Sequence, residues 1–462
     1  MVRENCVKEY LLKEGYAINT EAQEVIKLCD AWYANREMEF HRRKTIQGED
    51  YHLHRMNFAK RCCNDDANLC EVVEINSGSD EQCEFIRNVF AGSNFDTMYR
   101  RQLERVSANG TAACYVRVDN VQFLSNGMTR GGKIKLNYVD ADCYIPLTVE
   151  NDVITEAAFS GSSLVSGKKH TTLVVFRVDE HGKYTSDTHV FNDMGKELLD
   201  RQITVKLGDI KPFAVIRTAE VNNFDNMEGY GFPKVLNSIP VFEGLDLCYN
   251  ILFGDLDKGE KLVLINDMLC KFDKSGNPIT PNEQIKKTFV LLGEKLPDQD
   301  DVYHEYNPEI RVEQITKVFE LLLSLLSMSF GYGTKKYTFE NGRITTATEY
   351  IGNRQDQMQD LNRQRFEASQ YIKDIVKAVL WYSNTFLGGS WDLDGEVTID
   401  YDDSYITDRE TERERKRNDA LSFEIAQLKV WYLMDAYALS EEEAKKLVDQ
   451  SEQDDSDEEE KD

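Results

Sequence analysis

The run Leu321-Leu322-Leu323-Ser324-Leu325-Leu326-Ser327-Met328-Ser329-Phe330 decides how this chain is organised. It ends a segment from Ile310 whose apolar residues recur at helical spacing. The run is too short to cross a hydrocarbon layer, which needs about 20 residues. We therefore expect this helix to be buried against protein, either within the chain or in another copy of it.

A second, much longer helix is predicted after it. From Thr345 to Phe386 the sequence has no proline and no glycine past Gly352, and its apolar residues keep one stripe. Thr346 and Glu349 have capping-box spacing, which predicts where the helix begins. A helix of about 40 residues is roughly 60 Å long. Its pattern fits a long structural helix in an oligomeric assembly, a long surface helix or a coiled coil.

The part before these helices is predicted to be an α+β body. Helical spacing marks Glu21–His41, Met56–Val72 and a segment near Phe95–Val106. Short runs rich in β-branched residues follow and predict an antiparallel sheet or a small sandwich: Cys114–Val118, Lys133–Leu136, Leu173–Val178 and Ile203–Val205.

Further elements flank the leucine-rich helix. A helix after Pro233 has one apolar face, although Gly244 and Gly254 each cost it about 1 kcal/mol relative to alanine. Strands are predicted at Lys261–Ile265, Thr288–Leu292 and, beyond the long helix, Glu396–Tyr401. A charged helix is predicted from Asp408, with a stripe of Leu421, Ile425, Leu428 and Trp431, and another begins near Ser440 and Glu443.

Composition limits the classes of function. The chain has 462 residues, 41% of them apolar, which suggests about three domain-sized units. Its N-terminus is charged, so we expect no signal peptide, no membrane span and synthesis in the cytoplasm. Its ten cysteines show no paired CxxC spacing and predict reduced thiols. A net charge of −27 argues against tight binding of DNA, because affinity for a duplex comes mainly from cations that displace counterions.

Candidate catalytic and metal motifs are weak. Gly161–Lys169 imitates a phosphate loop, but five residues separate its glycines, and a hairpin turn is the better interpretation. His52 and His54 with Cys62, Cys63 and Cys70 lack the paired spacing of a zinc site. Asp400, Asp402, Asp403 and Asp408 leave a metal-dependent nuclease as an unfavoured alternative. The basic run His41–Lys44 is interpreted as the end of a helix, where cations favour the dipole.

Five short motifs, in this order along nearly the whole chain, give a family resemblance: Tyr230-Gly231-Phe232-Pro233, Ile344–Glu349, Gln355–Met358, Leu361–Gln364 and Asp402–Asp408. In this set the chain resembles the portal proteins of tailed double-stranded DNA phages, in the long-tailed branch. The resemblance implies a largely helical α+β fold with wing, stem, clip and crown regions. It also implies that the long helix lines or bridges a central channel.

The resemblance implies these boundaries: wing 1–232, first stem helix 233–260, clip 261–309, second stem helix 310–330, tunnel loop 331–344, long wing helix with the following strand 345–403, crown 404–450 and a disordered acidic tail 451–462. It places the cations Lys335, Lys336 and Arg343 of the tunnel loop at the channel. There they would follow the phosphate backbone loosely without reading bases. By sequence alone the same residues also fit an ordinary exposed loop.

A portal is a non-enzymatic ring of roughly a dozen copies at one capsid vertex. The resemblance implies a role in nucleating head assembly and in admitting and releasing DNA, with no cofactor, no metal and no membrane. It implies as partners the terminase large subunit, a head–tail connector protein, the major capsid and scaffold proteins, and double-stranded DNA bound without sequence specificity. The expected location is the virion. A cytosolic coiled-coil adaptor is the main alternative class.

Overall fold

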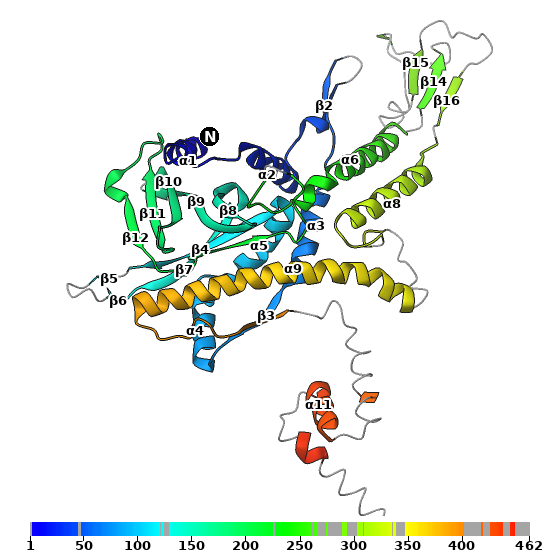
Figure 1. The fold of residues 1–462 in the computed structure, drawn as a ribbon. Coiled ribbons are helices and arrows are strands. Elements are labelled where there is room, and N and C mark those ends of the chain that lie inside the picture. The colour runs from blue at the N-terminus through cyan, green and yellow to red at the C-terminus, as the bar shows by residue number, and fades with distance from the viewer. Residues whose placement is uncertain are drawn as a thin grey trace, which may run out of the picture. The chain divides into compact units, whose positions relative to one another are not determined.

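The structure is a computed structural model with mixed helix and strand, 48% and 25%, which is compatible with the predicted α+β class (Figure 1). It forms two compact units, Met1–Asn68 with Ser77–Val397, and Leu69–Asn76 with Thr398–Asp462. It describes residues 2–44, 48–120, 122–123, 129–165, 167–224, 227–259, 262–266, 274–275, 289–292, 303–307, 309–334, 336–338, 347–401, 417–418, 426–437 and 444–448.

The first unit begins with helices, and two predicted helix boundaries are wrong. The helix predicted over Glu21–His41 ends at Tyr33, because Asn35 has φ of 54° and leads into the 3-10 turn η1 (Glu39–His41). The segment predicted to be helical over Met56–Val72 is helical only to Cys70, and Val72 begins a strand. The helices are α1 (Val2–Lys13), α2 (Thr20–Tyr33), α3 (Phe58–Ala67), α4 (Asp80–Ala91) and α5 (Phe95–Asn109).

The basic run His41–Lys44 is also not the end of an α-helix. After His41 the chain forms strand β1 (Arg42–Lys44), which pairs antiparallel with β2 (Asp50–His52). The α-helical hydrogen bonding already stopped at Tyr33, so no helix dipole is present for these cations to stabilise. They belong to a hairpin.

Two antiparallel sheets form the predicted sheet region. One has the order β12-β11-β10-β9-β8 and the other β13-β4-β7. Rings from both sheets meet in the core, where Phe213 lies 5.5 Å from Phe159 and 5.7 Å from Phe176 between centroids. The strands are β4 (Thr111–Asp119), β7 (Lys133–Asp140), β8 (Tyr144–Glu150), β9 (Val153–Val165), β10 (Lys168–Val178), β11 (Tyr184–Phe191), β12 (Ile203–Lys206) and β13 (Phe213–Arg217), with a small pair β5 (Gln122–Phe123) and β6 (Thr129–Arg130).

The segment Gly161–Lys169 is a hairpin, as predicted. Val165 of β9 pairs with Lys168 of β10, which leaves a two-residue turn, and Gly167 has φ of 77°. A phosphate loop instead requires a strand followed by a helix. The motif therefore carries no nucleotide site.

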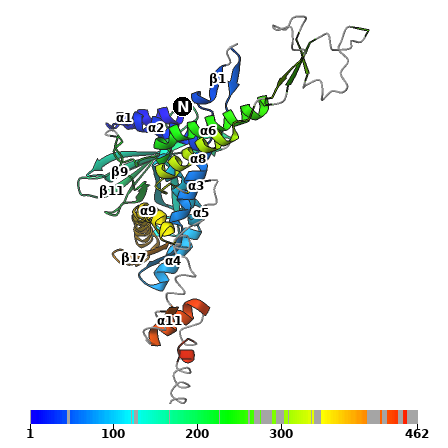
Figure 2. The same ribbon diagram turned by 90° about the vertical axis from the view of Figure 1, so that its right-hand side faces the viewer.

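Two helices pack side by side next to this body (Figures 1 and 2). They are α6 (Lys234–Lys258) and α8 (Val312–Ser329). A Cβ at Gly244 would lie 3.1 Å from the side chain of Leu322, so the missing side chain lets the helices approach closely. Between them in sequence is a sheet of order β15-β14-β16, made of β14 (Leu262–Asn266), β15 (Phe289–Leu292) and β16 (Tyr303–Tyr306).

The predicted long helix is α9 (Ala347–Tyr382), with 36 residues and therefore a length of about 54 Å. The predicted stripe is buried within the chain at Leu361, Ala368, Ile372, Ile375 and Val379, whereas the side chains of Ile351 and Met358 lie outside the described set. The helix packs on β13 and β4 (Figure 1). It ends in a π-helical turn, Ser383–Leu387, and Gly388 has φ of 73°.

The second unit contains the pair β3 (Val72–Ser77) and β17 (Val397–Tyr401), which confirms the predicted strand near Glu396. Helix α11 (Ala426–Tyr437) places Val430 in a small core with Ala444 and Val448. Trp431, predicted to belong to the apolar stripe, is 59% exposed. The buried face of the helix contains its neighbour Val430 instead. Leu421, Ile425 and the proposed cap Ser440 lie outside the described residues.

Two glycines let the start of β4 cross the segment that leads into α6. A Cβ at Gly110 would lie 2.2 Å from the carbonyl oxygen of Gly231, and a Cβ at Gly231 would lie 2.2 Å from that of Gly110. The Gly231 amide donates to Thr111 Oγ1 at 2.8 Å, and the Thr218 amide donates to the Gly110 carbonyl at 3.0 Å. The Tyr230-Gly231-Phe232-Pro233 motif is therefore a backbone crossing.

Replacing Gly231 tests this crossing. Gly231→Ala should lower the free energy of unfolding by about 2–4 kcal/mol, because the new methyl group meets backbone that cannot move aside. Gly161→Ala is the matched control, since its Cβ would meet nothing within 4 Å, and it should change stability by less than about 1 kcal/mol. Urea denaturation followed by circular dichroism measures both; equal midpoints would contradict the crossing.

Candidate functional site

The predicted loop cations are only partly within the described structure. Lys336 is exposed, and its Nζ lies 5.5 Å from the centroid of the Tyr332 ring, a cation–π contact. Lys336 forms no ion pair with any residue that the structure describes. Lys335 and Arg343 lie outside the described residues, so their predicted role at a channel stays a prediction.

The start of this loop forms a tight turn at the end of α8. Gly331 has φ of 77°, and the Tyr332 amide donates to the Ser327 carbonyl at 2.9 Å across the helix end. This is the hydrogen bond of a Schellman cap. The turn ends α8 and directs the chain that follows it toward α3.

Two tyrosines attach the segment Gly331–Thr338 to α3, and we call this segment with its contacts the tyrosine anchor. Tyr332 is buried, and its hydroxyl donates to Asp66 Oδ1 at 3.2 Å. The Tyr337 hydroxyl donates to Asp65 Oδ2 at 3.1 Å, and its amide donates to Ser327 Oγ at 3.0 Å. The described start of the loop is thus held at several points.

A buried ion pair completes the tyrosine anchor. Lys234, the first residue of α6, lies with its Nζ 3.0 Å from Asp66 Oδ1, and the two side chains are 6% and 12% exposed. Burial, together with the nearby Asp66 carboxylate, raises the pKa of Tyr332 well above its usual value, so this phenol remains a neutral donor. Two adjacent aspartates therefore join α3, the start of α6 and the end of α8.

The candidate zinc ligands belong to this packing and not to a metal site. Burial raises the pKa of the Cys62 thiol to about 12 and raises that of the Cys63 thiol well above its usual value, so neither thiol is disposed to ionise and ligate. His52 lies 2.5 Å from Glu37 on an exposed hairpin. Among the residues described, no group of three or more candidate ligands gathers.

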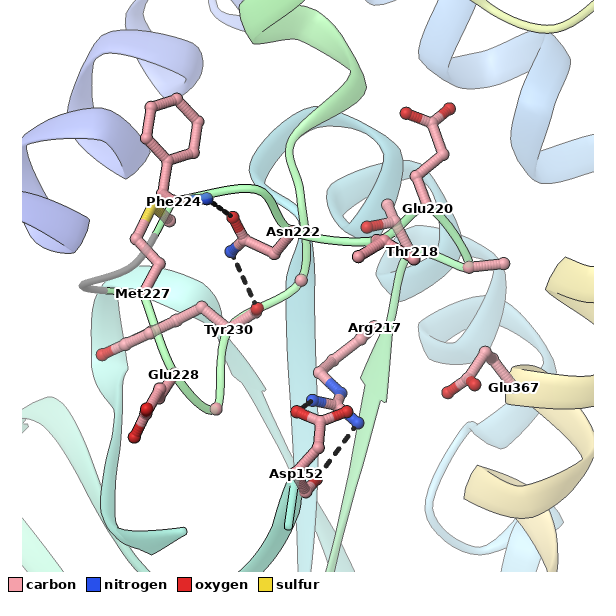
Figure 3. A pocket seen from close by; sticks show the side chains of 14 residues that line it. Asp152, Arg217, Thr218, Glu220, Asn222, Phe224, Met227, Glu228, Tyr230 and Glu367 are labelled. Atoms are coloured by element: carbon pink, nitrogen blue, oxygen red, sulfur yellow. Dashed lines mark hydrogen bonds and ion pairs between the residues drawn. The ribbon is translucent and has the colours of Figure 1, made fainter. Parts of the chain in front are cut away.

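A second polar site surrounds the segment between β13 and α6 (Figure 3). It is a cavity of about 360 Å³. On one side Arg217 donates to Asp152 Oδ1 at 2.5 Å, and on the other the Asn222 side chain donates to the Tyr230 carbonyl at 3.1 Å. Its charged lining residues are Asp152, Arg217, Glu220, Glu228 and Glu367.

The long helix α9 lines this cavity with Glu367, and its Gln364 binds the backbone next to it. Gln364 accepts a hydrogen bond from the Ala219 amide at 3.0 Å and donates to the Arg217 carbonyl at 3.2 Å, which extends the backbone pairing of β13. Glu367 is half-buried and has no hydrogen-bond partner within the described structure. Burial raises its pKa, although the Arg217 guanidinium opposes the shift.

A buried group that resembles a catalytic triad has a structural role. The Tyr10 hydroxyl lies 2.8 Å from His189 Nε2, and His189 Nδ1 lies 2.6 Å from Glu197. These contacts tie α1 to the sheet, beside a core that includes Cys6, Val7 and Leu11. The tyrosine is itself approached by Arg177 at 3.5 Å, so it is enclosed by protein rather than presented to a substrate.

The acidic turns proposed for a nuclease are mostly untested. Asp402, Asp403 and Asp408 lie outside the described residues, and Asp400 is exposed on β17. Nearby, Asp392 Oδ1 accepts the Asp394 amide at 3.0 Å, an ordinary turn.

The sequence interpretation missed the polar partners that form these sites: Asp65, Asp66, Lys234, Asp152, Arg217 and Glu367. No local pattern marks them, because each contact joins elements far apart in sequence. A lysine directly after Pro233 at a helix start, where it opposes the dipole, was the one available signal for Lys234.

Comparison with known proteins adds no relative: no family model and no curated protein matches this chain. The portal resemblance therefore depends on the quoted motifs.

Removing the buried carboxylate tests the tyrosine anchor. Asp66→Asn removes the negative charge that pairs with Lys234 in a poorly solvated site and should lower the free energy of unfolding by about 3 kcal/mol. Asp193→Asn, at an exposed turn, should change it by less than about 0.5 kcal/mol. Urea denaturation at one fixed protein concentration measures both. Equal losses in the two variants would mean that the pair does not hold these elements.

The raised pKa of Glu367 predicts a pH-dependent stability. A folded-state pKa above the unfolded value means that the fold prefers the protonated carboxyl, so stability from this group is present at low pH and lost as pH rises through the folded pKa. Glu367→Gln should therefore raise the melting temperature at neutral pH, and the difference from wild type should shrink on acidification. Glu180→Gln, at an exposed turn, should show no such trend. A constant difference at all pH values would contradict this assignment.

Proposed function

We propose that this chain is the subunit of a phage portal, a ring at one capsid vertex through which double-stranded DNA is packaged and later ejected. The observation that carries the proposal is an exposed apolar surface on the helix pair α6 and α8. The quoted motifs supply the family, and the following contacts support a role for sister copies.

Helix α8 has a second apolar face, and α6 has exposed apolar residues on two sides. On α8, Ile315, Phe319, Leu323 and Leu326 are buried, while another stripe faces outward. Burying a large apolar side chain stabilises by about 1.5–3 kcal/mol, so exposed apolar residues on two helices that pack antiparallel form a costly surface in water. The outward residues are Leu247, Ile251, Phe253 and Leu256 on α6, and Val312, Val318, Leu321, Leu325 and Met328 on α8, between 41% and 61% exposed.

A ring covers such stripes efficiently. In a closed ring each copy contacts its neighbours through two different surfaces, so one helix stripe of each copy packs on a different stripe of the next. A single chain with two outward stripes on adjacent helices is suited to that arrangement. In this proposal α6 and α8 are the stem, β14–β16 the clip, α9 the long wing helix and α11 part of the crown.

The charge and the long helix favour this class over the alternatives. A net charge of −27 disfavours lasting contact with a duplex that slides through. Helix α9 buries its stripe on its own strands β4 and β13, as a framework helix does, whereas a coiled-coil adaptor would reserve that stripe for a partner. The proposed partners are the terminase large subunit, a head–tail connector, capsid and scaffold proteins, and DNA bound without sequence specificity.

Imaging combined with stripe variants tests the proposal. Negative-stain images of the purified wild-type chain should show rings with a central hole. Leu321→Ser with Leu325→Ser should abolish these rings while leaving the circular dichroism spectrum unchanged, because both side chains are outside the core of the chain. Leu164→Ser with Leu199→Ser, leucines of the sheet region that are more exposed still, is the control and should preserve the rings.

The other outcomes discriminate between classes. A wild-type chain that stays monomeric at high concentration, alone and with head proteins, would remove the portal proposal. Elongated dimers would favour the adaptor. Magnesium-dependent cleavage of plasmid DNA that Asp402→Ala and Asp403→Ala abolish would favour the nuclease.

A further inference from the structure

The β1–β2 hairpin projects from the first unit beside α6 (Figure 2). All residues of both strands are exposed. A two-stranded hairpin alone is marginally stable in water. Two questions follow: what holds it in place, and what its exposed faces contact.

Its base is fixed to α6 by four polar contacts. Asp246 Oδ2 lies 3.0 Å from His41 Nε2, and Asp246 Oδ1 accepts the Met56 amide at 2.8 Å. Asn250 both accepts from the His54 amide and donates to the His54 carbonyl, each at 2.8 Å. His41 and Asp246 are 1% and 4% exposed. The hairpin is therefore held in a defined position on the helix.

Both ring nitrogens of the histidine in this clamp have hydrogen-bond partners. His41 Nδ1 accepts a hydrogen bond from the Met38 amide at 3.1 Å, so it carries no proton. The proton is then on Nε2, which donates to Asp246. Because the ring is committed on both nitrogens, this clamp is structural.

The two faces of the hairpin differ. Side chains alternate along a strand, so Arg42 and Lys44 share one face with His52 and Asp50. That face is internally paired: Arg42 lies 3.4 Å and His52 2.5 Å from Glu37, and Lys44 lies 3.7 Å from Asp50. It needs no further partner.

The opposite face presents an arginine between two aromatic rings. Arg43 is directly across from Tyr51, and its guanidinium carbon lies 4.9 Å from the centroid of the Phe40 ring. Tyr51 is 45% exposed. Across the described part of the chain, Arg43 forms no ion pair. Exposed arginine and tyrosine on a rigid support have the composition of an interface hot spot, and a guanidinium recognises a carboxylate with two parallel hydrogen bonds.

Charge selects a protein partner over a nucleic acid. Between residues 37 and 52 the three cations are matched by Glu37, Glu39, Glu49 and Asp50, so this segment does not attract a phosphate backbone. The chain as a whole has 82 acidic against 55 basic residues, and it thus offers carboxylates in excess.

The hairpin also continues into the surface that sister copies would cover. His54, at its base, lies 4.8 Å from the Phe253 ring between centroids, and Phe253 is one of the outward residues of α6. An occupant of that stripe would lie next to the hairpin.

We propose that the Arg43–Tyr51 face binds a carboxylate-bearing surface of a neighbouring copy of this chain. The inference depends on the proposed ring, and it assigns to the hairpin the role of an arm that reaches the next subunit. The buried clamp at Asp246 and Asn250 sets its direction, so little ordering is needed when the contact forms.

Mass photometry over a concentration series tests this inference. Arg43→Ala should raise the concentration at half-assembly by about tenfold, and Arg43→Glu should raise it more, because it places like charges together. Arg42→Ala is the matched control on the self-paired face and should change it by less than about twofold. Equal circular dichroism spectra and melting temperatures establish that all variants fold.

The outcomes separate this inference from the ring itself. If wild type assembles into rings and both Arg43 variants assemble equally well, the hairpin inference is overturned and the ring stands. If wild type does not assemble, both fall. Loss of duplex DNA binding by Arg43→Glu without any change in assembly would assign the face to nucleic acid and overturn the inference.

A cross-link identifies the contacted surface. The photoreactive residue p-benzoylphenylalanine in place of Tyr51 should link two copies of the chain through an acidic peptide, whereas the same residue in place of His52, on the opposite face, should not. Cross-links from position 51 to a peptide without carboxylates would contradict the proposed partner chemistry.

Discussion

The buried ion pair between Lys234 and Asp66 is the interaction on which the arrangement of the first unit depends. Removing either partner leaves the other charge in a poorly solvated site, which is far more costly than losing a surface pair. Since Lys234 begins α6 and the same carboxylate accepts from Tyr332 just after α8, one aspartate fixes the start of α6 and the end of α8 on α3. Ser238 and Ser329, 2.8 Å apart between hydroxyl oxygens, join the two helices at this same end.

The backbone crossing at Gly110 and Gly231 complements that pair. It holds the segment entering α6 against β4 at a distance that any side chain would prevent. Gln364 of α9 then pairs with the other end of the segment, next to Arg217. The helix pair, the sheets and the long helix are thus joined through a few backbone contacts and one buried charge. The exposed stripes of α6 and α8 are held in place by this joint.

The elements that the sequence predicted are those with a strong local pattern. The β-branched runs became antiparallel strands, the hairpin at Gly161–Lys169 was correct, and the buried stripe of α9 followed its spacing. The errors have physical causes. Asn35 adopts a left-handed conformation that ends α2 early, so His41–Lys44 fell outside the helix. Gly244 was expected to destabilise its helix, but the space left by its missing side chain is occupied by Leu322. The anchoring contacts of Asp66, Asp246 and Gln364 link segments that are far apart in sequence, so no periodic sequence pattern predicts them.

The sheet between α6 and α8 has a consequence for the order of folding. Because β16 pairs antiparallel with β14, closing that sheet brings the end of α6 to the start of α8, where Arg311 binds Asp255 through two hydrogen bonds of 2.9 and 2.8 Å. The conformational entropy lost in closing the chain between α6 and α8 is then lost only once, when the sheet forms at the end of the helix pair far from α3. After that, α6 and α8 are at a high effective concentration relative to each other and can pack progressively toward α3. Nucleation at the tip followed by propagation toward the body would make this helical hairpin a late but rapid step of folding.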